Sequence, residues 1–531
     1  MSSDHNSKLP KKIYHPTILF PSVSKMSTSK RFTCLRCQFQ SLTRSPPRRL
    51  YHVSPRLRSE IPKPSIAPKQ SIDIKHIRTH PELYEKSCIE RNYKLQSTYP
   101  AKVISLFEKW HEHQRDGRAL RERNNKLKLQ LANPKSLRND DSEDAHSLRA
   151  LSKEEIIAEA RSLKDKISQI ETSETALMTE INTLASAIPN LTSDFTPRGS
   201  EPKVIRTINE HPEPIPSSSD RVWRSHVHIG SELNLLDFSS AATTSGWGWY
   251  YLLNGAALLE QALVQYSLSL ALSKKWSIVS PPTMIYSHIA SACGFQPRDQ
   301  SGEQQIYSIA QTPSDAESGK PTYSLAGTAE IPLAGMKADS TIHESQLPLK
   351  TIATSRCYRA EAGARGIDTK GLYRVHEFTK VEMFAWTLPT LESTTEVFNE
   401  MLSLQIEILT SLNLHCRILE MPSTDLGASA MRKIDIEAFF PSRRERDDGW
   451  GEVTSLSICG DYQSRRLATK VDIAANGGKV AFPWTVNGTA VAVPRVVAAI
   501  LENGWDEERK EVRVPECLWP WMGGRKVLKK E

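Results

Sequence analysis

Residues Ser355–Phe384, SRCYRAEAGARGIDTKGLYRVHEFTKVEMF, contain the pattern that decides the fold. Two strand-like segments flank a loop of glycines and charges, and Arg359 and Glu361 share one face of the first segment because alternate residues of a strand point the same way. The corresponding face of the second segment carries Arg374, His376 and Phe378. Such a hairpin offers cations, an aromatic ring and a carboxylate to one pocket, which suits a polyphosphate, a purine and an ammonium group. The competing interpretation is an amphipathic hairpin whose charged face is only solvated.

The order Arg-x-Glu, long loop, Arg-x-x-x-Phe resembles motif 2 of the class II aminoacyl-tRNA synthetases, and the hairpin sequence is similar to that of seryl-tRNA synthetases. Gly327–Glu330 (GTAE) resembles the loop with which that family contacts its amino acid, and the helix that ends in WSIVSPP resembles motif 1, the dimer interface. Three further stretches match the family: HVHIGSELNLLDF, TVNGT at Thr485–Thr489 and RVPECLWPWMGG. The resemblance therefore covers nearly the whole chain after residue 70.

The positive charge of the chain is concentrated at its N-terminus. Residues 1–59 hold 12 Lys or Arg and one acid, Asp4, and removing these from totals of 69 basic and 61 acidic residues leaves 57 and 60. From Met26 onward the segment is rich in Arg and Ser, as mitochondrial transit peptides are, and Arg48–Tyr51 resembles the residues before a matrix-processing cut. We therefore expect residues 1–52 to target the protein to the mitochondrial matrix, with Met26 as an alternative start; the other interpretation is a basic arm that binds RNA. No apolar run approaches the roughly 18 residues of a membrane helix, so no membrane contact is expected.

The eight cysteines predict neither a metal site nor a disulfide framework. Cys34 and Cys37 form a CxxC, but no second pair exists and both lie in the predicted targeting segment. The other six are scattered without ligand spacing and suit reduced thiols: Cys88, Cys293, Cys357, Cys416, Cys459 and Cys517. The chain also lacks a GKT/S P-loop and a GxGxxG motif, so ATP, if bound, is held in another way.

Between Pro-rich linkers at residues 53–70 and 191–221, a 3.5-residue period predicts two coiled-coil helices. The first series is Val103, Leu106, Trp110, His113, Gly117, Leu120, Asn124, Leu127 and Leu131. The second series is Leu163, Ile167, Ile170, Glu174, Leu177, Ile181, Leu184 and Ile188, which breaks only at the glutamate. Pro134 and the run NDDSEDAH separate the two, so an antiparallel hairpin about 50 Å long is expected. Taken alone, such a hairpin is commonly a dimerisation or packing element.

Seryl-tRNA synthetases carry an N-terminal helical arm that grips the variable arm and elbow of their tRNA, and residues 71–190 are similar to that domain. The resemblance therefore implies that this arm binds tRNA(Ser). Six basic residues, expected away from the seam, would contact phosphates without reading bases: Arg115, Arg118, Arg121, Arg123, Lys126 and Lys128.

Residues 222–531 alternate helical signals with short β-branched or aromatic runs, which is typical of an α+β domain built on an antiparallel sheet. We therefore expect an α+β protein in which an antiparallel coiled-coil helical arm precedes a class II synthetase catalytic domain, an antiparallel sheet flanked by helices. The resemblance adds that the protein is a homodimer.

The resemblance also implies roles for single residues. Arg359 would bind the α-phosphate of ATP and the carboxylate of the amino acid while that carboxylate attacks phosphorus, and Arg495 would clamp the γ-phosphate, so both are predicted catalytic residues. Glu361 would accept a hydrogen bond from the adenine amino group, and Phe378 would stack on the ring beside the backbone of Val375. The remaining ATP contacts are expected in EVTS: Glu452, Val453, Thr454 and Ser455. The first and last of these four would hold Mg²⁺ against the phosphates through hard oxygen ligands.

Selectivity for L-serine would rest on groups that pair its hydroxyl and ammonium groups. The resemblance assigns this pocket to Thr328, Glu330, Arg359, Glu382, Asn487 and Thr489. A pocket that hydrogen-bonds a hydroxyl group rejects the analogue lacking it, because its own polar groups are then left unpaired. Alanine should therefore be excluded better than threonine, which is excluded only by size.

Several residues depart from the family pattern, among them Ile458 and Cys459, where relatives often have Asn and an aromatic residue. Ala490 and Pro494 take two places where motif 3 alternates glycines before its arginine, and Lys275 stands where bacterial relatives have glycine. Alanine costs little where φ is negative, and proline is tolerated in a first helical turn. We therefore expect an enzyme that activates serine with ATP and transfers it to the 3′ end of tRNA(Ser) in mitochondrial translation. The alternatives are a catalytically silent relative that binds tRNA or assists assembly, and the same fold specific for threonine or glycine.

Overall fold

The structure is a computed structural model that describes residues 67–133, 151–211, 224–295, 305–360, 371–445, 447–473, 477 and 480–531. The chain divides into two compact units, Met1–Pro64 and Ser65–Glu531, and the described residues belong to the second. The predicted targeting segment, residues 1–52, lies outside the described residues. Within the described part of the chain, no helix is both long enough and apolar enough to cross a membrane.

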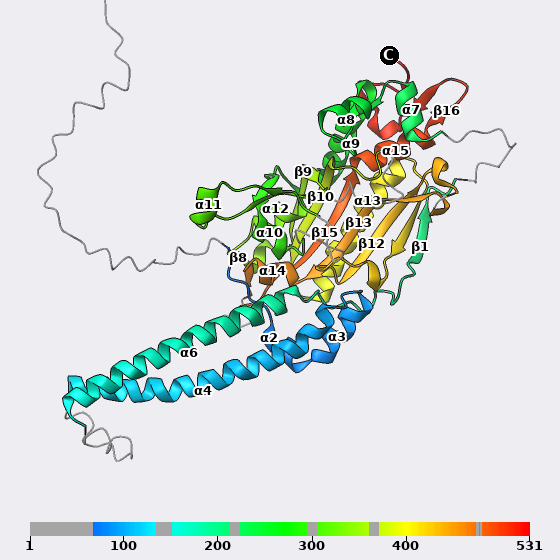
Figure 1. The fold of residues 1–531 in the computed structure, drawn as a ribbon. Helices are drawn as coiled ribbons and strands as arrows, with labels where there is room; N and C mark the ends of the chain where they lie inside the picture. The colour runs from blue at the N-terminus through cyan, green and yellow to red at the C-terminus, as the bar shows by residue number, and fades with distance from the viewer. Residues whose placement is uncertain are drawn as a thin grey trace, which may run out of the picture. The chain divides into compact units, whose positions relative to one another are not determined.

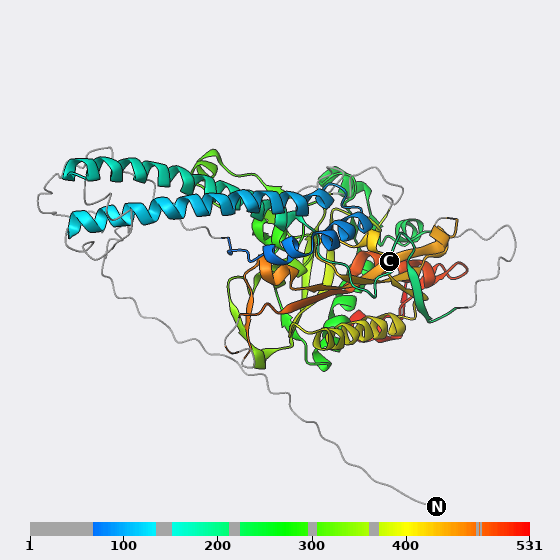
Figure 2. The ribbon, with the colours of Figure 1, turned by 90° about the horizontal axis from the view of Figure 1, so that it is seen from below.

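The N-terminal arm is built on two long helices, α4 (Tyr99–Ala132) and α6 (Lys153–Ala187), which lie side by side along their length (Figure 1, Figure 2). Ser152 starts α6 with a capping box. Its hydroxyl oxygen accepts from the Glu155 amide, and the Glu155 carboxylate accepts from the Ser152 amide. Two short helices precede the pair, α2 (Ile74–Thr79) and α3 (Pro81–Glu90). The predicted helical arm is thus confirmed, while its predicted turn at Pro134 lies outside the described residues.

Two residues that interrupt the apolar period of the predicted seam, Gly117 of α4 and Glu174 of α6, face each other. Val103 and Leu127 of α4 and Ile181 of α6 are fully buried, as the apolar period predicts. Glu174 is only 9% exposed, and a Cβ atom built on Gly117 would lie 3.2 Å from its Oε1 atom. A glycine at this position therefore makes room for a carboxylate within the coiled coil.

Two buried arginines attach the base of the arm to the C-terminal part of the chain. The Arg91 guanidinium donates to the backbone oxygens of Asn190 and Gly427. The Arg466 guanidinium lies 3.3 Å from the centre of the Tyr462 ring and donates to the Ser186 carbonyl at 3.0 Å. Two of these three bonds, to Asn190 and Ser186, satisfy carbonyl groups at the point where the arm ends.

The C-terminal part is organised by an eight-stranded sheet with the order β1-β11-β12-β13-β15-β10-β9-β4 (Figure 1). Its strands, in that order, are Lys203–Ile208, Cys416–Glu420, Arg432–Phe439, Trp450–Gly460, Trp484–Ala492, Glu377–Thr387, Leu349–Tyr358 and Ser277–Val279. All neighbours pair antiparallel except β4 and β9, which are parallel. The expected fold class, a helical arm followed by an antiparallel sheet flanked by helices, is confirmed.

The segment expected to be a plain linker, residues 191–221, contains a strand. Residues Lys203–Ile208 form β1, which pairs with β11 at the edge of the sheet. Its side chains are exposed except for a half-buried Ile208, so the burial pattern that marks most strands is missing. Backbone pairing rather than side-chain burial makes these six residues a strand.

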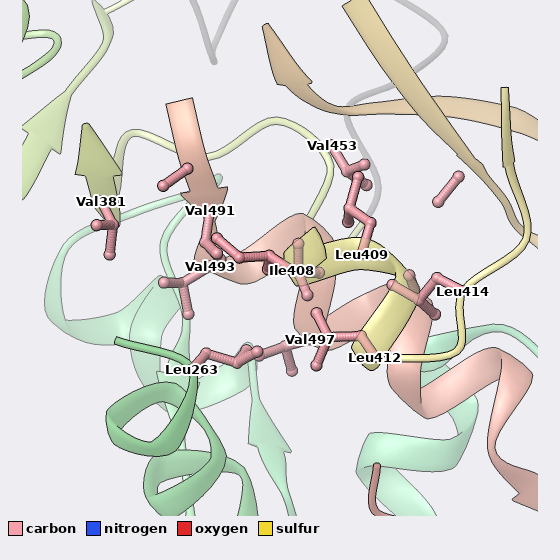
Figure 3. Packing of buried hydrophobic residues seen from close by; sticks show 14 of the residues in the cluster. Leu263, Val381, Ile408, Leu409, Leu412, Leu414, Val453, Val491, Val493 and Val497 are labelled. Atoms are coloured by element: carbon pink, nitrogen blue, oxygen red, sulfur yellow. The ribbon is translucent and has the colours of Figure 1, made fainter. Parts of the chain in front are cut away.

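One face of the sheet is covered by α9 (Asn254–Ser273), α13 (Leu391–Ser411) and α15 (Val493–Asn503). Leu263, Ile408 and Val497 of these helices meet the sheet residues Val381 and Val491 in a continuous apolar core (Figure 3). Because alternate residues of a strand point to opposite faces, the residues on either side of Val381 point away from this core. That opposite face is the one available for a site.

Shorter elements complete the fold. The helices are α7 (His226–Glu232), α8 (Ser239–Thr244), α10 (Ser287–Ala292), α11 (Pro313–Glu317), α12 (Glu330–Gly335) and α14 (Tyr462–Arg466). The short strands are β2 (Leu236–Asp237), β3 (Tyr251–Leu252), β5 (Met284–Tyr286), β6 (Ser308–Ile309), β7 (Tyr323–Leu325), β8 (Thr341–His343), β14 (Lys470–Asp472), β16 (Trp505–Asp506), β17 (Glu511–Arg513) and β18 (Val527–Leu528). The 3₁₀ turns are η2 (Gln96–Thr98), η3 (Glu344–Gln346), η5 (Ser423–Asp425), η6 (Pro441–Arg443), η7 (Asp447–Gly449) and η9 (Glu516–Met522).

Candidate active site

A cavity of about 210 Å³ lies where β10, β13 and β15 meet the start of α15. Its wall includes most of the predicted ATP-binding residues: Arg359, Val375, Phe378, Glu452, Val453, Thr454, Ser455 and Arg495. The predicted serine-binding residue Thr489 also lines it. Arg374, which the hairpin pattern placed on the pocket face without a single role, also lines it, and five lining residues were not predicted as site residues: Leu372, Tyr373, Lys380, Ala492 and Pro494. Glu361 lies outside the described residues.

The aromatic part of the wall is supplied by the start of β10. The Arg359 guanidinium carbon lies 5.3 Å from the centre of the Phe378 ring, within the range of a cation–π contact. Phe378 packs with Val375 and Cys357 in a small buried cluster of its own. The Arg359 amide donates to the His376 carbonyl at 2.9 Å, which ties the end of β9 to the start of β10. A flat apolar ring beside a cation can hold a purine next to a phosphate.

Arg495 and Glu452, both predicted site residues, form an ion pair with an Nη1–Oε2 distance of 3.1 Å. The same guanidinium donates to the carbonyls of Glu452 at 3.0 Å and Tyr373 at 3.1 Å, which fixes its position. Desolvation opposes the charge of the Glu452 carboxylate, but Arg495 and then Lys433 outweigh it and lower the pKa of Glu452 to about 2. The carboxylate is therefore ionised at neutral pH.

A β-bulge brings Glu452 and Ser455 to one face although they are three positions apart, an odd spacing that would put them on opposite faces of a regular strand. On β12 the consecutive residues Ile436 and Glu437 pair with Thr454 and Glu452, so Val453 is the extra residue of β13. A bulge shifts the alternation of a strand by one residue, and the side chains on its two sides then point the same way. An ionised carboxylate and a hydroxyl group are oxygen donors of the kind that Mg²⁺ accepts alongside phosphates and water, so the pair fits the predicted metal. Within the described ranges, no cluster of three His, Cys, Asp or Glu residues could hold a metal ion.

The predicted serine pocket contains a buried ion pair that continues from the cavity wall. Lys380 and Glu382 are alternate residues of β10, and the Lys380 Nζ atom lies 2.7 Å from Glu382 Oε2. The Thr489 hydroxyl donates to the same oxygen at 3.1 Å. Side-chain exposures of 6% and 1% show that Lys380 and Glu382 are shielded from water. Glu382 thus has both a cation and a hydroxyl donor.

Glu330, at the start of α12, is the second buried carboxylate of this pocket. Its amide donates to the Thr328 hydroxyl oxygen at 3.3 Å, so the two predicted residues lie together. Burial and then the charge of Glu382 raise the pKa of Glu330 to about 7. Two neighbouring carboxylates that share one lysine leave negative charge for a substrate ammonium group to neutralise.

Four predicted serine-binding residues do not reach the wall of the 210 Å³ cavity: Thr328, Glu330, Glu382 and Asn487. Glu382 is linked to the wall through Lys380 and Thr489, as described above. Asn487 lies two residues before Thr489 on β15, and its Oδ1 atom accepts from the Cys459 thiol at 3.4 Å. The structure therefore brings most of the predicted set together and leaves these four behind the wall.

Sequence reasoning missed Lys380 and Gln405. The sequence does point to Lys380, because Phe378, Lys380 and Glu382 are alternate residues of one predicted strand and therefore share a face. Gln405 is a fully buried residue of α13 whose Nε2 atom lies 2.8 Å from the carbonyl oxygens of both Ser455 and Thr489. The sequence feature that could have identified Gln405 is its position four residues after Met401, on the apolar face of α13. It holds the two site strands together from the core side.

The predicted basic surface of the arm is smaller than expected. Arg121 pairs across the hairpin with Glu174 at 3.2 Å, and Arg123 pairs with Glu159 at 2.9 Å. Both residues lie off the apolar series, but their long guanidinium side chains reach across the hairpin to acids of α6. Arg115, Arg118 and Lys128 are exposed, and Lys126 is half-buried. Arg118 pairs with Glu122 on its own helix at 3.1 Å.

Two family models match this chain: the seryl-tRNA synthetase N-terminal domain over residues 72–192 and the tRNA synthetase class II core domain (G, H, P, S and T) over residues 314–504. The mitochondrial serine–tRNA ligase of Saccharomyces cerevisiae is 40% identical over 376 residues, which cover 70% of this chain and 80% of the relative. The chain belongs to the seryl-tRNA synthetase family. The mitochondrial serine–tRNA ligase of Schizosaccharomyces pombe is 37% identical over 452 residues, which cover 85% of this chain and 88% of that relative. The crystal structure of seryl-tRNA synthetase from Pyrococcus horikoshii complexed with ATP has a TM-score of 0.74 and 29% identity, covering 87% of this chain and 100% of that one.

The structure accommodates two departures from the motif 3 of seryl-tRNA synthetases. Ala490 is not among the described residues with positive φ, and Pro494 lies in the first turn of α15, where a missing amide donor is tolerated. Lys275 differs, because its φ of 64° is the left-handed region that favours glycine. It follows α9 in a Schellman motif, in which the Lys275 and Trp276 amides donate to the carbonyls of Leu272 and Ala271.

Proposed function

We propose that this member of the seryl-tRNA synthetase family activates L-serine with ATP to seryl-adenylate and transfers the seryl group to the 3′ end of tRNA(Ser). One arrangement supports the proposal above all: Arg359 lies over an aromatic ring that suits a purine, and its charge acts on the buried carboxylate of Glu330, which suits an ammonium group. A carboxylate and an α-phosphate would meet at this guanidinium. No observation among the described residues favours a catalytically silent protein.

In the activation step, an oxygen of the serine carboxylate attacks the α-phosphorus of ATP, the bond to the β-phosphate breaks and pyrophosphate leaves. Arg359 would orient the two anions and offset the charge that accumulates between them. Arg495, held by the carbonyls of Tyr373 and Glu452, would bind the γ-phosphate. Glu361 would accept from the adenine amino group above Phe378. Mg²⁺, held by Glu452 and Ser455, would neutralise phosphate charge when bound.

Recognition of serine would combine charge and a hydroxyl partner. Glu330 and Glu382 would take the ammonium group, while Thr489, Asn487 and Thr328 would provide the polar contacts of the pocket. Lys380 supplies one positive charge for two carboxylates, and the substrate ammonium group would supply the second. Alanine would leave a buried partner of the hydroxyl group unpaired, so the proposal predicts that alanine is rejected.

Transfer to tRNA would use the arm and a second subunit. The 3′-terminal ribose hydroxyl attacks the carbonyl of the adenylate and AMP leaves, while the arm, residues 71–190, holds the body of the tRNA. Arg115, Arg118 and Lys128 are the exposed candidates for phosphate contacts, whereas Arg121 and Arg123 would act mainly within the hairpin. Exposed apolar residues near motif 1 support a homodimer: Leu272, Ile278 and Met284.

The proposed location is the mitochondrial matrix. Relatives named mitochondrial support a mitochondrial protein, and the acid-poor basic composition of residues 1–52 supports import. The remaining division of the chain would be a linker at 53–70, the arm, a linker interrupted by β1 at 191–221 and a catalytic domain at 222–531. A fluorescent protein fused after residue 52 should enter the matrix, and it should stay outside when the arginines of that segment are changed to glutamate.

Amino-acid-dependent exchange between ATP and pyrophosphate tests the activation step without tRNA. The full chain is compared with serine, threonine, alanine and glycine in turn. Exchange with serine alone is the expected result. Exchange with threonine or glycine instead would assign the pocket to another amino acid, and no exchange with any of the four would contradict the proposal.

A further inference from the structure

Gln463 lies behind the predicted serine pocket, on the short helix α14, and is fully buried. Its Nε2 atom donates to Glu330 Oε1 at 2.6 Å. Its Oε1 atom accepts from the Thr485 hydroxyl at 2.7 Å. Gln463 does not line the 210 Å³ cavity, and Glu330 is the predicted pocket residue to which its side chain donates.

The orientation of the Gln463 amide follows from the number of protons available. The Thr485 hydroxyl has one proton, and its only other acceptor among the described residues is the Gly460 carbonyl at 3.5 Å. The shorter contact places the Gln463 oxygen next to Thr485, which leaves the NH₂ group facing the carboxylate. A carboxylate that accepts this bond is held in one position and favoured in its ionised form.

The helix that carries Gln463 is itself held from its far side. Arg466, three residues further along α14, lies against the Tyr462 ring and donates to the Ser186 carbonyl at the end of the arm. The Arg466 Nη1 atom also donates to the Tyr462 carbonyl at 3.1 Å, at the start of the same helix. Gln463 therefore lies on a short helix that is anchored to the arm.

Glu330 lacks the cation that its neighbour has. On β10, Lys380 pairs directly with Glu382, whereas the only described hydrogen-bond donor to the Glu330 side chain is the neutral amide of Gln463. Other charged or titratable groups face Glu330 from the surrounding elements: Arg359 after β9, Cys293 after α10 and Cys459 on β13. Of these, only Arg359 is cationic, and its attraction is smaller than that of Lys380.

We infer that Gln463 is a positioning residue of the serine pocket, which aims the Glu330 carboxylate and favours its ionised form for the ammonium group of the amino acid. This inference rests on the proposed function, because it assigns a purpose to a residue that does not touch the substrate. It explains why a buried glutamine lies between a threonine hydroxyl and a carboxylate. It also distinguishes the two carboxylates, since Glu382 contacts Lys380 directly whereas Glu330 contacts the amide of Gln463.

The test compares Gln463→Met with Ser464→Ala in the exchange reaction between pH 6 and 9, using the full chain. Methionine keeps the length of the side chain and removes the donor. Ser464 is the matched control, because it is a buried neighbour on α14 whose hydroxyl lacks a hydrogen-bond partner in the described structure. Loss of a bond to a charged group should raise the KM for serine roughly ten-fold or more in the methionine variant, with the KM for ATP changed less than two-fold.

The pH profile distinguishes positioning from a general structural defect. Because Glu330 must be ionised, kcat/KM for serine in the unaltered protein should fall as the pH drops through about 7. Removing the donor raises the pKa of Glu330 further, so this limb should move to higher pH in Gln463→Met and stay in place in Ser464→Ala. Thr485→Val, which removes only the hydroxyl that orients the amide, should shift the limb in the same direction by less.

The outcomes separate the inference from the function on which it rests. If the unaltered protein exchanges with serine but Gln463→Met matches Ser464→Ala in KM and in pH profile, the inference is overturned. An equal rise in the KM values for serine and ATP, without a shift of the acid limb, also overturns it, because that result indicates a structural role only. If the unaltered protein shows no exchange, the proposed function fails and the inference fails with it.

Discussion

Thr489 faces Glu382 across β15 and β10, with 3.1 Å between its hydroxyl and the Glu382 Oε2 atom, because β15 carries one extra residue at this point. Val381 pairs with Val491 while the next residue, Glu382, pairs with Thr489, so Ala490 is the residue of the bulge. A second bulge, at Val453, brings Glu452 and Ser455 to one face. Both halves of the proposed site therefore depend on irregular pairing in neighbouring strands.

Replacement of Arg359 should remove activation and leave the fold intact. Arg359→Ala is expected to lower kcat for serine-dependent exchange by roughly 10²–10³-fold, because this guanidinium would face both reacting anions. Arg356→Ala is the control, since that side chain is 46% exposed and pairs with Glu377 at 2.8 Å outside the cavity. Equal losses in the two variants would contradict the role of Arg359.

Glu330→Gln should stabilise the protein without ligand while it abolishes serine activation. The pKa of Glu330 is raised from its usual 4.5 to about 7, so its contribution to stability is present below pH 4.5 and is lost as the pH rises through about 7. At pH 8 the buried charge is therefore a cost on the order of 1–3 kcal/mol, which the neutral amide removes. Thermal unfolding at pH 5 and pH 8 measures the difference, and the gain should be confined to the higher pH.

Glu382→Gln is the matched contrast and should do the opposite. This change leaves the buried Lys380 ammonium, 2.7 Å from the altered group, without its counter-charge. Breaking such a pair costs about 3–5 kcal/mol, so the melting temperature should fall at pH 8. If both variants changed stability in the same direction, the proposed division of charge between the two carboxylates would be wrong.

Lys275→Gly should raise stability without changing activity. Lys275 adopts a φ of 64° with an exposed side chain, and a residue with a Cβ atom pays about 1 kcal/mol or more for that conformation. Ser273→Gly, at the last residue of α9, is the control and should lower stability by about 0.5 kcal/mol, because glycine has a lower helix propensity than serine. Chemical denaturation measures the free energy of unfolding of both variants, which should rise in Lys275→Gly and fall in Ser273→Gly.

Charge reversal on the arm should weaken tRNA binding and spare serine activation. The double variant Arg115→Glu, Lys128→Glu changes two exposed residues and should reduce the salt dependence of tRNA(Ser) binding by about two phosphate contacts. Arg123→Met should instead destabilise the hairpin, because it leaves Glu159 without its partner across the seam. If the double variant bound tRNA(Ser) as tightly and with the same salt dependence as the unaltered protein, the tRNA would not contact Arg115 and Lys128.

The periodic parts of the fold were predictable and the irregular parts were not. The 3.5-residue period predicted the paired helices, and the alternation around Val381 predicted the strand that carries Phe378 and Glu382. Neither bulge could be predicted, because register is set by pairing between strands that are distant in sequence. The exposed edge strand β1 has no buried face to mark it, and the role of Gln463 depends on Glu330, 133 residues earlier in the chain.

Charging of tRNA(Ser) by the full chain is the most direct test of the central claim. The account predicts that serine becomes attached to the 3′ end of tRNA(Ser) only when ATP is present, and that alanine and threonine are not attached. Arg359→Ala should bind the tRNA and fail to charge it. A protein that binds tRNA(Ser) normally but attaches no amino acid in the presence of ATP would contradict the account and favour a silent member of the family.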